Sequence, residues 1–346
     1  MLTLSCPAPI LTTNRVLLGH GSGGKLSADL IRDVFLNVFR SPILARMDDQ
    51  AIVEVGGSRI AFTTDSFVVK PLFFRGGNIG SLAIHGTIND LAMGGADPLF
   101  LSAGFILEEG FEIGELRKIA ESMGHAADDA GVEIVTGDTK VVEKGSGDGL
   151  FINTTGIGLV PLGVYLSASN VRPGDQILLS GTLGDHGIAI LSERESIGFD
   201  LTIGSDSAAL HTLVGKMLAV SRQIHCLRDP TRGGLASAVN EIAARAGVGM
   251  TLHESEIPVR DEVRAACEML GLDPLYVANE GKLIAFVAPE AADAVLTEMR
   301  AHPLGKGAMR IGEVTRAHPG LVTMKTSFGT TRIVDMLAGD QLPRIC

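Results

Sequence analysis

The feature that most constrains the fold is an alternation of strand-like and helix-like segments that resets once along the chain. In the first half, apolar residues recur at helical spacing in residues 26–40, 78–94 and 112–130. Strand-like runs in the same half occupy residues 51–55, 59–63, 99–107, 133–136 and 151–159. The glycine-rich link at residues 56–58 predicts a hairpin between the first two runs, and we expect the strand at 133–136 to be buried.

The pattern resets in a turn-rich stretch between Pro161 and Pro173. Beyond it, strands are expected at residues 176–180, 249–254, 283–288 and 310–315. Helices are expected at residues 186–194, 206–221, 234–246, 261–270 and 290–301. The alternation predicts an α/β (α+β) architecture, and 346 residues are too many for one typical core. We therefore predict domains at 1–165 and 166–330, followed by a flexible tail at 331–346.

Composition excludes several classes of protein. A net charge of −11, no Trp and only 2 Tyr argue against a nucleic-acid binder that stacks bases. The start of the chain has no basic region before its short apolar stretch, and no run approaches the roughly 20 apolar residues of a membrane helix. The four cysteines are scattered without a C-x-x-C pair, which fits a reducing cytosol. We expect a cytoplasmic protein in which Cys226 and Cys267 are packing residues.

A glycine-rich segment runs from Gly19 to Lys25 and nearly matches a phosphate-binding P-loop. It fails the pattern because Leu26 stands where Ser or Thr should bind magnesium, and no strong strand precedes it. Two interpretations stay open, a glycine loop whose lysine closes over phosphates and a plain helix entry.

Aspartates at the ends of apolar runs are more informative. They are Asp48, Asp49, Asp65, Asp90, Asp138 and Asp229. Carboxylates at strand ends point into the cleft where α/β folds bind ligands, and oxygen ligands suit Mg²⁺ shared with nucleotide phosphates. Any single one is better explained as a helix cap or turn residue. Together, with two lysines and glycine loops, they favour a metal–nucleotide site.

The chain ends in a cysteine, Cys346. A cysteine at the chain terminus does not pack in a core. It is either an ordinary tail residue or a reactive thiol carried at the end of a flexible segment. Residues 339–346 reach at most about 27 Å when extended, which is enough for the thiol to visit more than one site.

Seven motifs together resemble one family. They are Gly21-Ser22-Gly23-Gly24-Lys25, Thr64-Asp65-Ser66-Phe67-Val68-Val69, Asn89-Asp90-Leu91-Ala92-Met93-Gly94-Gly95, Gly137-Asp138-Thr139-Lys140-Val141, Gly181-Thr182-Leu183-Gly184-Asp185-His186-Gly187, Arg228-Asp229-Pro230-Thr231-Arg232-Gly233-Gly234 and Pro343-Arg344-Ile345-Cys346. The chain resembles, essentially end to end, the HypE family of hydrogenase maturation factors, within the PurM-like (aminoimidazole ribonucleotide synthetase) superfamily. The Pro-Arg-Ile-Cys ending separates it from selenophosphate and thiamin-phosphate kinase relatives.

The resemblance implies an activity and partners. A HypF-type carbamoyltransferase delivers a carbamoyl group to Cys346 as a thiocarboxamide, and ATP-dependent dehydration turns it into a thiocyanate. The cyanide then passes to iron on a HypC–HypD complex for [NiFe]-hydrogenase assembly. The implied PurM-like fold has an N-terminal sheet domain that pairs in a homodimer, and a C-terminal mixed-sheet domain with helices that covers the nucleotide.

The resemblance also implies roles for individual residues. The catalytic set is Cys346, Lys140, Asp138 and Glu280; the nucleotide contacts are Gly21, Gly23, Gly24, Lys25, Asn89 and Lys140; the Mg²⁺ ligands are Asp49, Asp65, Asp90 and Asp229. Glu280 stays open between a proton acceptor, a group that positions the tail and a plain loop carboxylate. His85 stays open between lining the site and a structural role. A small-molecule kinase on this fold and an ATP-sensing scaffold remain rival functions.

Overall fold

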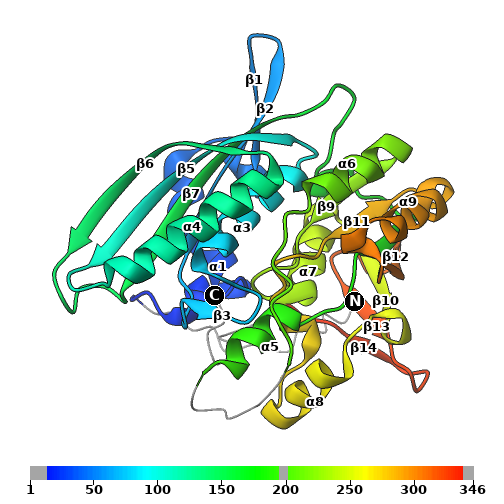
Figure 1. The fold of residues 1–346 in the computed structure, drawn as a ribbon. Coiled ribbons are helices and arrows are strands. Elements are labelled where there is room, and N and C mark those ends of the chain that lie inside the picture. Colours follow the sequence, from blue (N-terminus) through cyan, green and yellow to red (C-terminus); the bar gives the residue numbers. More distant parts are fainter. Residues whose placement is uncertain (1–13, 195–201, 338–346) are drawn as a thin grey trace.

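The computed structural model describes residues 14–194 and 202–337, and two mixed β-sheets dominate it (Figure 1). The first sheet has the order β1-β2-β7-β5-β6, in which only β5 and β6 run parallel. Its strands are β1 (Ala51–Val55), β2 (Ser58–Phe67), β5 (Asp97–Glu108), β6 (Glu133–Val142) and β7 (Leu150–Leu159). The predicted hairpin is confirmed, because β1 pairs antiparallel with β2 and projects from the sheet in Figure 1.

Helices α3 (Ile79–Met93) and α4 (Ile113–Ala130) cover one face of this sheet (Figure 1). Asn78 caps α3, because its side-chain oxygen accepts the backbone N–H groups of Gly80 at 2.8 Å and Ser81 at 3.2 Å. Most of α3 is buried, and apolar residues on several of its sides pack into the core. This helix therefore forms the centre of the first half and extends toward the second.

The second sheet has the order β14-β13-β10-β12-β8-β11-β9. Its strands are β8 (Gln176–Leu179), β9 (Ile224–Arg228), β10 (Gly249–His253), β11 (Ile284–Val287), β12 (Met309–Thr315), β13 (Val322–Lys325) and β14 (Thr331–Ile333). A small two-stranded sheet joins β3 (Phe73–Phe74) and β4 (Gly77–Asn78). The connection between the two large sheets, from Leu159 to Gln176, contains the expected boundary near residue 165.

Helices cover both faces of the second sheet. They are α6 (His211–Val220) and α9 (Pro289–Ala301) on one face and α7 (Gly234–Ala246) on the other. Helices α5 (Asp185–Ser192) and α8 (Asp261–Leu270) pack instead into the core that contains α3 and α4. Alternate residues of β8 and β11 enter two separate cores, one shared with α6 and α9 and the other with α7. Burial on both faces explains why these strands read as continuous apolar runs.

Three sequence predictions differ from the structure. The helix expected at 26–40 is divided into α1 (Lys25–Leu30), a π-helical segment (Ile31–Leu36) and α2 (Asn37–Phe39). The helix expected from 206 begins only at His211, because side chains of α3 hydrogen-bond residues 207–210 in a non-helical form. The strand expected to be buried at 133–136 is an exposed edge strand, with Val135 55% exposed. The apolar residues of a strand do not show whether another part of the same chain packs over that strand.

The described part of the expected tail is anchored. β14 pairs with β13, and the next residue, Val334, donates its N–H to Val322 O at 2.9 Å. Tyr276 Oη then donates to Asp335 O at 2.8 Å, and Lys25 N donates to Leu337 O at 2.9 Å. Leu337, the last residue that the structure describes, is therefore held beside the glycine loop.

No helix within residues 14–194 and 202–337 is both long enough and apolar enough to span a membrane.

Candidate functional site

Three aspartates from distant parts of the chain converge between the two sheets. Asp49 precedes β1, Asp90 lies on α3, and Asp229 follows β9 directly. One carboxylate oxygen from each lies within 4.8 Å of the other two. The three residues belong to different elements, so the triad forms only when both halves of the chain fold together.

Burial and mutual repulsion disfavour the ionised forms of these carboxyls. Burial raises the pKa of Asp49 to about 8 although Arg228 opposes the shift, and it raises the pKa of Asp229 to about 6. The pKa of Asp90 is raised well above its ordinary value, first by burial and then by the charges of its acidic neighbours. Three converging carboxylates that repel one another suit a hard divalent cation such as Mg²⁺. The residues present therefore fit the predicted metal.

Neighbouring side chains fix the triad. Thr63 Oγ1 donates to Asp90 Oδ2 at 2.8 Å. Arg228 forms an ion pair with Asp49, and its Nη1 lies 3.7 Å from Glu241 Oε2. Arg228 Nη2 also donates to Met47 O at 3.3 Å. This bond holds the guanidinium in place, so that its ion pair with Asp49 orients the Asp49 carboxylate.

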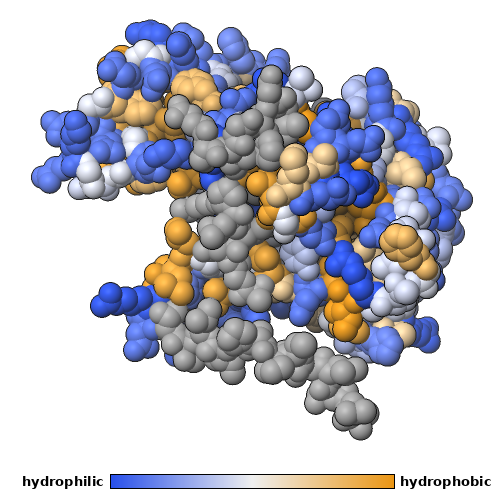
Figure 2. Space-filling model, turned by 90° about the horizontal axis from the view of Figure 1, so that it is seen from below, coloured by the Kyte–Doolittle hydropathy of each residue, from blue (hydrophilic) through white to orange (hydrophobic). Residues whose placement is uncertain are grey.

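Two adjoining pockets open onto the triad. The larger has a volume of about 610 Å³ and is bordered by the glycine loop at Gly21 and Gly23, by residues 47–51, and by Asp65 and Arg232. The surface seen from below is hollowed on one side, and apolar side chains border the opening (Figure 2). A cavity of this size with polar groups along one wall suits a drug-sized or nucleotide-sized ligand.

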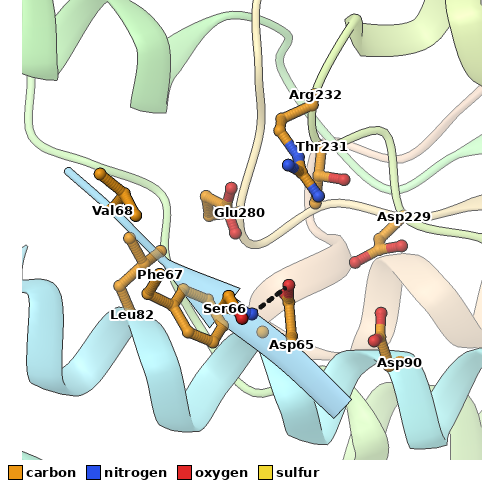
Figure 3. Close-up of a pocket in the computed structure, with 11 residues that line it drawn as sticks. Asp65, Ser66, Phe67, Val68, Leu82, Asp90, Asp229, Thr231, Arg232 and Glu280 are labelled. Carbon is orange, nitrogen blue, oxygen red and sulfur yellow. Dashed lines mark hydrogen bonds between the residues drawn. The ribbon is translucent and has the colours of Figure 1, made fainter. Parts of the chain in front are cut away.

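The smaller pocket, of about 70 Å³, lies between β2, α3 and the loop that carries Glu280 (Figure 3). Phe67, Val68 and Leu82 form an apolar wall, while Glu280 faces the side of Asp65 across the space. Glu280 is only 6% exposed, and burial followed by the charges of Asp229 and Asp65 raises its pKa well above the ordinary value. The pocket thus places a carboxyl that favours its protonated form beside the acidic triad.

Asp65 and Arg232 line both pockets. Asp65 lies outside the triad, and its Oδ1 accepts the N–H of Ser66 at 2.8 Å. Burial raises the pKa of Asp65, and the charge of Arg232 opposes that shift. Arg232 Nη1 donates to Gly21 O at 3.3 Å, which ties the glycine loop to the second half of the chain.

The glycine loop is shaped by close backbone contacts. A Cβ on Gly23 would lie 2.5 Å from Arg232 O, and Gly23 has a φ of +75°. A Cβ on Gly24 would lie 2.3 Å from Leu337 O. Gly21 and Gly23 border the larger pocket, whereas Gly24 packs against the end of the described chain and Lys25 is exposed outside both pockets.

Other predicted site residues lie elsewhere. The sequence suggests Asn89 as a nucleotide contact, but the structure buries it completely and commits its side chain to the protein. Its amide donates to Ala208 O at 3.0 Å and Glu280 O at 3.2 Å, and its oxygen accepts Leu210 N at 2.8 Å. Asn89 lines neither pocket, so this geometry does not support the expected cofactor contact.

Asp138 and Lys140 lie on the exposed edge strand β6, where Lys140 Nζ donates to both Asp138 oxygens at 2.9 and 2.7 Å. Each side chain is 70% exposed, and neither lines the pockets. His85 Nδ1 lies 2.9 Å from Ser207 Oγ, and burial lowers its pKa to about 4, which supports its structural interpretation. Cys346 lies outside the described residues.

The site contains residues that the sequence analysis missed. Arg228 and Arg232 lie on either side of Asp229 in the motif at residues 228–234. Thr63 lies two residues before Asp65 near the end of a strand. A strand prediction for β9 would have drawn attention to Arg228, because this residue ends the strand that leads directly into Asp229. Cys226 and Cys267 are buried as expected.

Comparison with known proteins identifies the two halves. Residues 47–160 match the model described as AIR synthase related protein, N-terminal domain, and residues 172–324 match AIR synthase related protein, C-terminal domain. The carbamoyl dehydratase HypE of Cupriavidus necator is 58% identical over 337 residues, which cover 97% of this chain and 96% of that protein.

Two solved structures share the fold at 50% sequence identity. A HypE–HypF complex contains a chain with a TM-score of 0.85, and the match covers 89% of this chain and 99% of that one. A HypE structure in complex with ATP gives a TM-score of 0.80 over 96% of this chain and all of that one.

Proposed function

Because the chain belongs to the HypE family of carbamoyl dehydratases, we propose that it dehydrates a carbamoyl group carried as a thiocarboxamide on Cys346. The product is a thiocyanate that supplies the cyanide ligand of the [NiFe]-hydrogenase iron centre. The observation that carries the proposal is the pair of pockets beside three converging carboxylates, with the chain held at Leu337 beside the glycine loop.

The larger pocket is the proposed ATP site. A relative solved with ATP supports this assignment. Gly21 and Gly23 let the backbone approach the phosphates. Lys25, at the first turn of α1, lies exposed outside the pocket, and its side chain must turn toward the phosphates to contribute its charge. Asp49, Asp90 and Asp229, with Asp65 beside them, hold Mg²⁺. When bound, ATP with Mg²⁺ supplies a phosphoryl group that makes the carbamoyl oxygen a leaving group.

The smaller pocket is the proposed site of the carbamoyl group. The amide must lose its oxygen as phosphate and both N–H protons to become a nitrile, so a proton acceptor must face it. Glu280 borders this pocket and is the proposed acceptor in its ionised form, which its raised pKa makes a stronger base. The apolar wall of Phe67 and Leu82 keeps bulk water from the reacting group.

The anchored segment delivers Cys346. Cys346 follows Leu337 by nine positions in the sequence, and such a length spans at most about 31 Å. With this reach a thiolate at its end can receive the carbamoyl group from a partner and return to the pocket. We assign the partners as a HypF-type carbamoyltransferase, for which a relative's complex gives support, and a HypC–HypD complex.

The outer face of the first sheet supports a homodimer. Phe62 and Phe100 are both in register with Ile157, and the three side chains are 39–44% exposed. An uncovered apolar row of this kind is typical of an interface between chains. Lys140 is in register with Ile106 on β5, also 45% exposed, so any role for Lys140 and Asp138 in the reaction requires that this face meet a second copy.

The experiment that tests the function is phosphate release from protein that has first been carbamoylated. We expect ATP-dependent phosphate release from the native chain, and none from a Cys346→Ala protein given the same treatment. Glu280→Gln should accept the carbamoyl group but convert it on the order of 10²-fold more slowly.

The outcomes separate the two rival functions. Dehydration that survives in Cys346→Ala would indicate a kinase-like enzyme acting on a diffusible substrate. A carbamoylated native chain that releases no phosphate with Mg²⁺ and ATP would indicate a scaffold that senses ATP.

A further inference from the structure

The Glu280 peptide is held by two side chains from outside its own loop. Its N–H donates to Asp206 Oδ1 at 3.1 Å, and its carbonyl accepts Asn89 Nδ2 at 3.2 Å. Asn89 belongs to α3 of the first half, whereas Asp206 belongs to the irregular segment at residues 205–210 that precedes α6. The carboxyl that faces the smaller pocket is therefore fixed by groups on both sides of its backbone.

Asp206 is built into this position. Its Oδ2 accepts Lys282 Nζ at 2.9 Å, and the Asp206 side chain is 4% exposed. A Cβ on Gly281 would lie 1.8 Å from Asp206 O, so only glycine lets the two backbones approach this closely. Asp206 therefore bonds to both neighbours of Gly281, through the N–H of Glu280 and the ammonium group of Lys282.

The segment that carries Asp206 is itself bound to the first half. Ser207 Oγ lies 2.9 Å from His85 Nδ1, and Ala208 O and Leu210 N both bond to Asn89. Ser205 Oγ lies 2.8 Å from His186 Nδ1 in the second half. Residues 205–210 therefore connect α3, which carries Asp90, to the loop that carries Glu280.

We propose that Asp206 is the positioning residue of Glu280, setting the distance between that carboxyl and the acidic triad. The proposal rests on the proposed function, in which Glu280 accepts a proton from the carbamoyl group. A displacement of about 1 Å in a catalytic group can reduce a rate on the order of 10²-fold. Asp206 makes no contact with substrate in this scheme, so its effect on the rate passes through the Glu280 peptide.

The chain offers a matched control in Asp175. That side chain is also buried, and its Oδ2 accepts one backbone N–H, from Arg172 at 3.0 Å, and lies 2.8 Å from one basic side chain, His225. Neither partner lines the pockets beside the triad. Asp175→Ala therefore removes a similar set of bonds away from Glu280.

The first test does not depend on activity. Hydrogen exchange of the Glu280 amide, measured in the full chain, should accelerate at least about tenfold in Asp206→Ala and stay unchanged in Asp175→Ala. Asp206→Asn retains the acceptor for this amide and should keep most of its protection. Asp206→Leu has nearly the same shape without the acceptor, so it should lose the protection and covers the case in which the alanine variant does not fold. Unchanged exchange in a folded Asp206→Ala or Asp206→Leu protein would overturn the proposal.

The second test measures the rate. Single-turnover dehydration of carbamoylated Asp206→Ala should be at least tenfold slower with the KM for ATP within about twofold, and Asp175→Ala should lose stability but keep its rate. In a Glu280→Gln background, Asp206→Ala should cause no further loss. Equal rate loss in Asp206→Ala and Asp175→Ala, or additive losses with Glu280→Gln, would refute positioning. If the native chain does not dehydrate at all, the proposed function fails, and the exchange experiment still decides the role of Asp206.

Discussion

Replacing Asp90 by Asn tests the electrostatics of the triad most simply. Asp90 places a carboxylate oxygen within 4.8 Å of oxygens of Asp49 and Asp229, and Thr63 Oγ1 donates to it at 2.8 Å. The Asn side chain has the same shape and keeps an oxygen that accepts the Thr63 hydroxyl. The substitution therefore removes one charge and leaves the packing and the hydrogen bond in place.

The magnitude follows from the geometry. Two unit charges 4.8 Å apart repel by about 3.5 kcal/mol at the effective dielectric constant of 20 that suits protein sites. The raised pKa values mean that bound protons already relieve part of this repulsion. We expect Asp90→Asn to increase the free energy of unfolding of the metal-free protein by about 1–3 kcal/mol near neutral pH, which raises the Tm by a few degrees.

The gain depends on pH in a defined direction. The folded-state pKa values of these carboxyls lie above their unfolded values, to about 8 for Asp49 and about 6 for Asp229. The contribution of these carboxyls to stability is therefore fully present below pH 3.8 and is lost as the pH rises through the folded-state values. The difference between Asp90→Asn and the native chain should grow between pH 5 and about pH 8.

The assay is thermal unfolding in EDTA and in a series of Mg²⁺ concentrations. The native chain should gain stability with Mg²⁺, and Asp90→Asn should start higher and gain little. Asp175→Asn is the control, because it removes a buried carboxylate that His225 and Arg172 stabilise, and it should be less stable in both buffers. An Asp90→Asn protein that is less stable than the native chain in EDTA, or that responds equally to Mg²⁺, would refute the reasoning.

Three further predictions concern other parts of the structure. Arg228→Met leaves Asp49 and Glu241 without their cation and should lower the free energy of unfolding by about 3–5 kcal/mol at pH 8, measured by urea unfolding; a loss below 1 kcal/mol would contradict the assignment. Ile157→Asp places a charge in the outward apolar row and should give a folded monomer by light scattering, whereas a persisting dimer would exclude this face as the interface. Burial lowers the pKa of His186 to about 4, so the free energy of unfolding should fall as the pH drops from 6.5 toward 4. His186→Asn should reduce that fall by at most about 3 kcal/mol, measured by urea unfolding across this pH range. An unchanged dependence of stability on pH would contradict this role of His186.

The sequence predicted the architecture well where periodicity and turn residues agree. The hairpin at β1 and β2 and the capped start of α3 both follow from local signals, a glycine link and an Asn cap. The second-half helices α7 and α9 likewise match the expected segments. These elements are determined by their own residues, which is why one sequence suffices.

Elements that depend on distant partners were not predictable. Residues 207–210 have helical spacing, yet bonds from His85 and Asn89 on α3 hold them in a non-helical form. These deciding groups lie 119–122 residues away in the sequence. β6 carries an apolar run that the described part of the chain leaves exposed, and the run itself does not show this.

The sequence indicated the acidic residues and the glycine loop that line the pockets, but not the arginines that hold them. Carboxylates at the ends of apolar runs pointed to Asp49, Asp90 and Asp229, and the structure brings these three together. Arg228 was missed because its role depends on the ion pair with Asp49, 179 residues away. The commitment of Asn89 to the backbone around Glu280 likewise appears only when the two halves are packed together.

The central claim is that Cys346 carries the group that the pocket dehydrates. The most direct measurement is mass spectrometry of the C-terminal peptide after incubation with a HypF-type carbamoyltransferase, its carbamoyl donor and Mg²⁺, with and without ATP added afterwards to the repurified chain. We expect a carbamoyl adduct on Cys346 that loses the mass of one water only when ATP is added. An adduct on Cys226 or Cys267, no adduct at all, or loss of water without ATP would contradict the account.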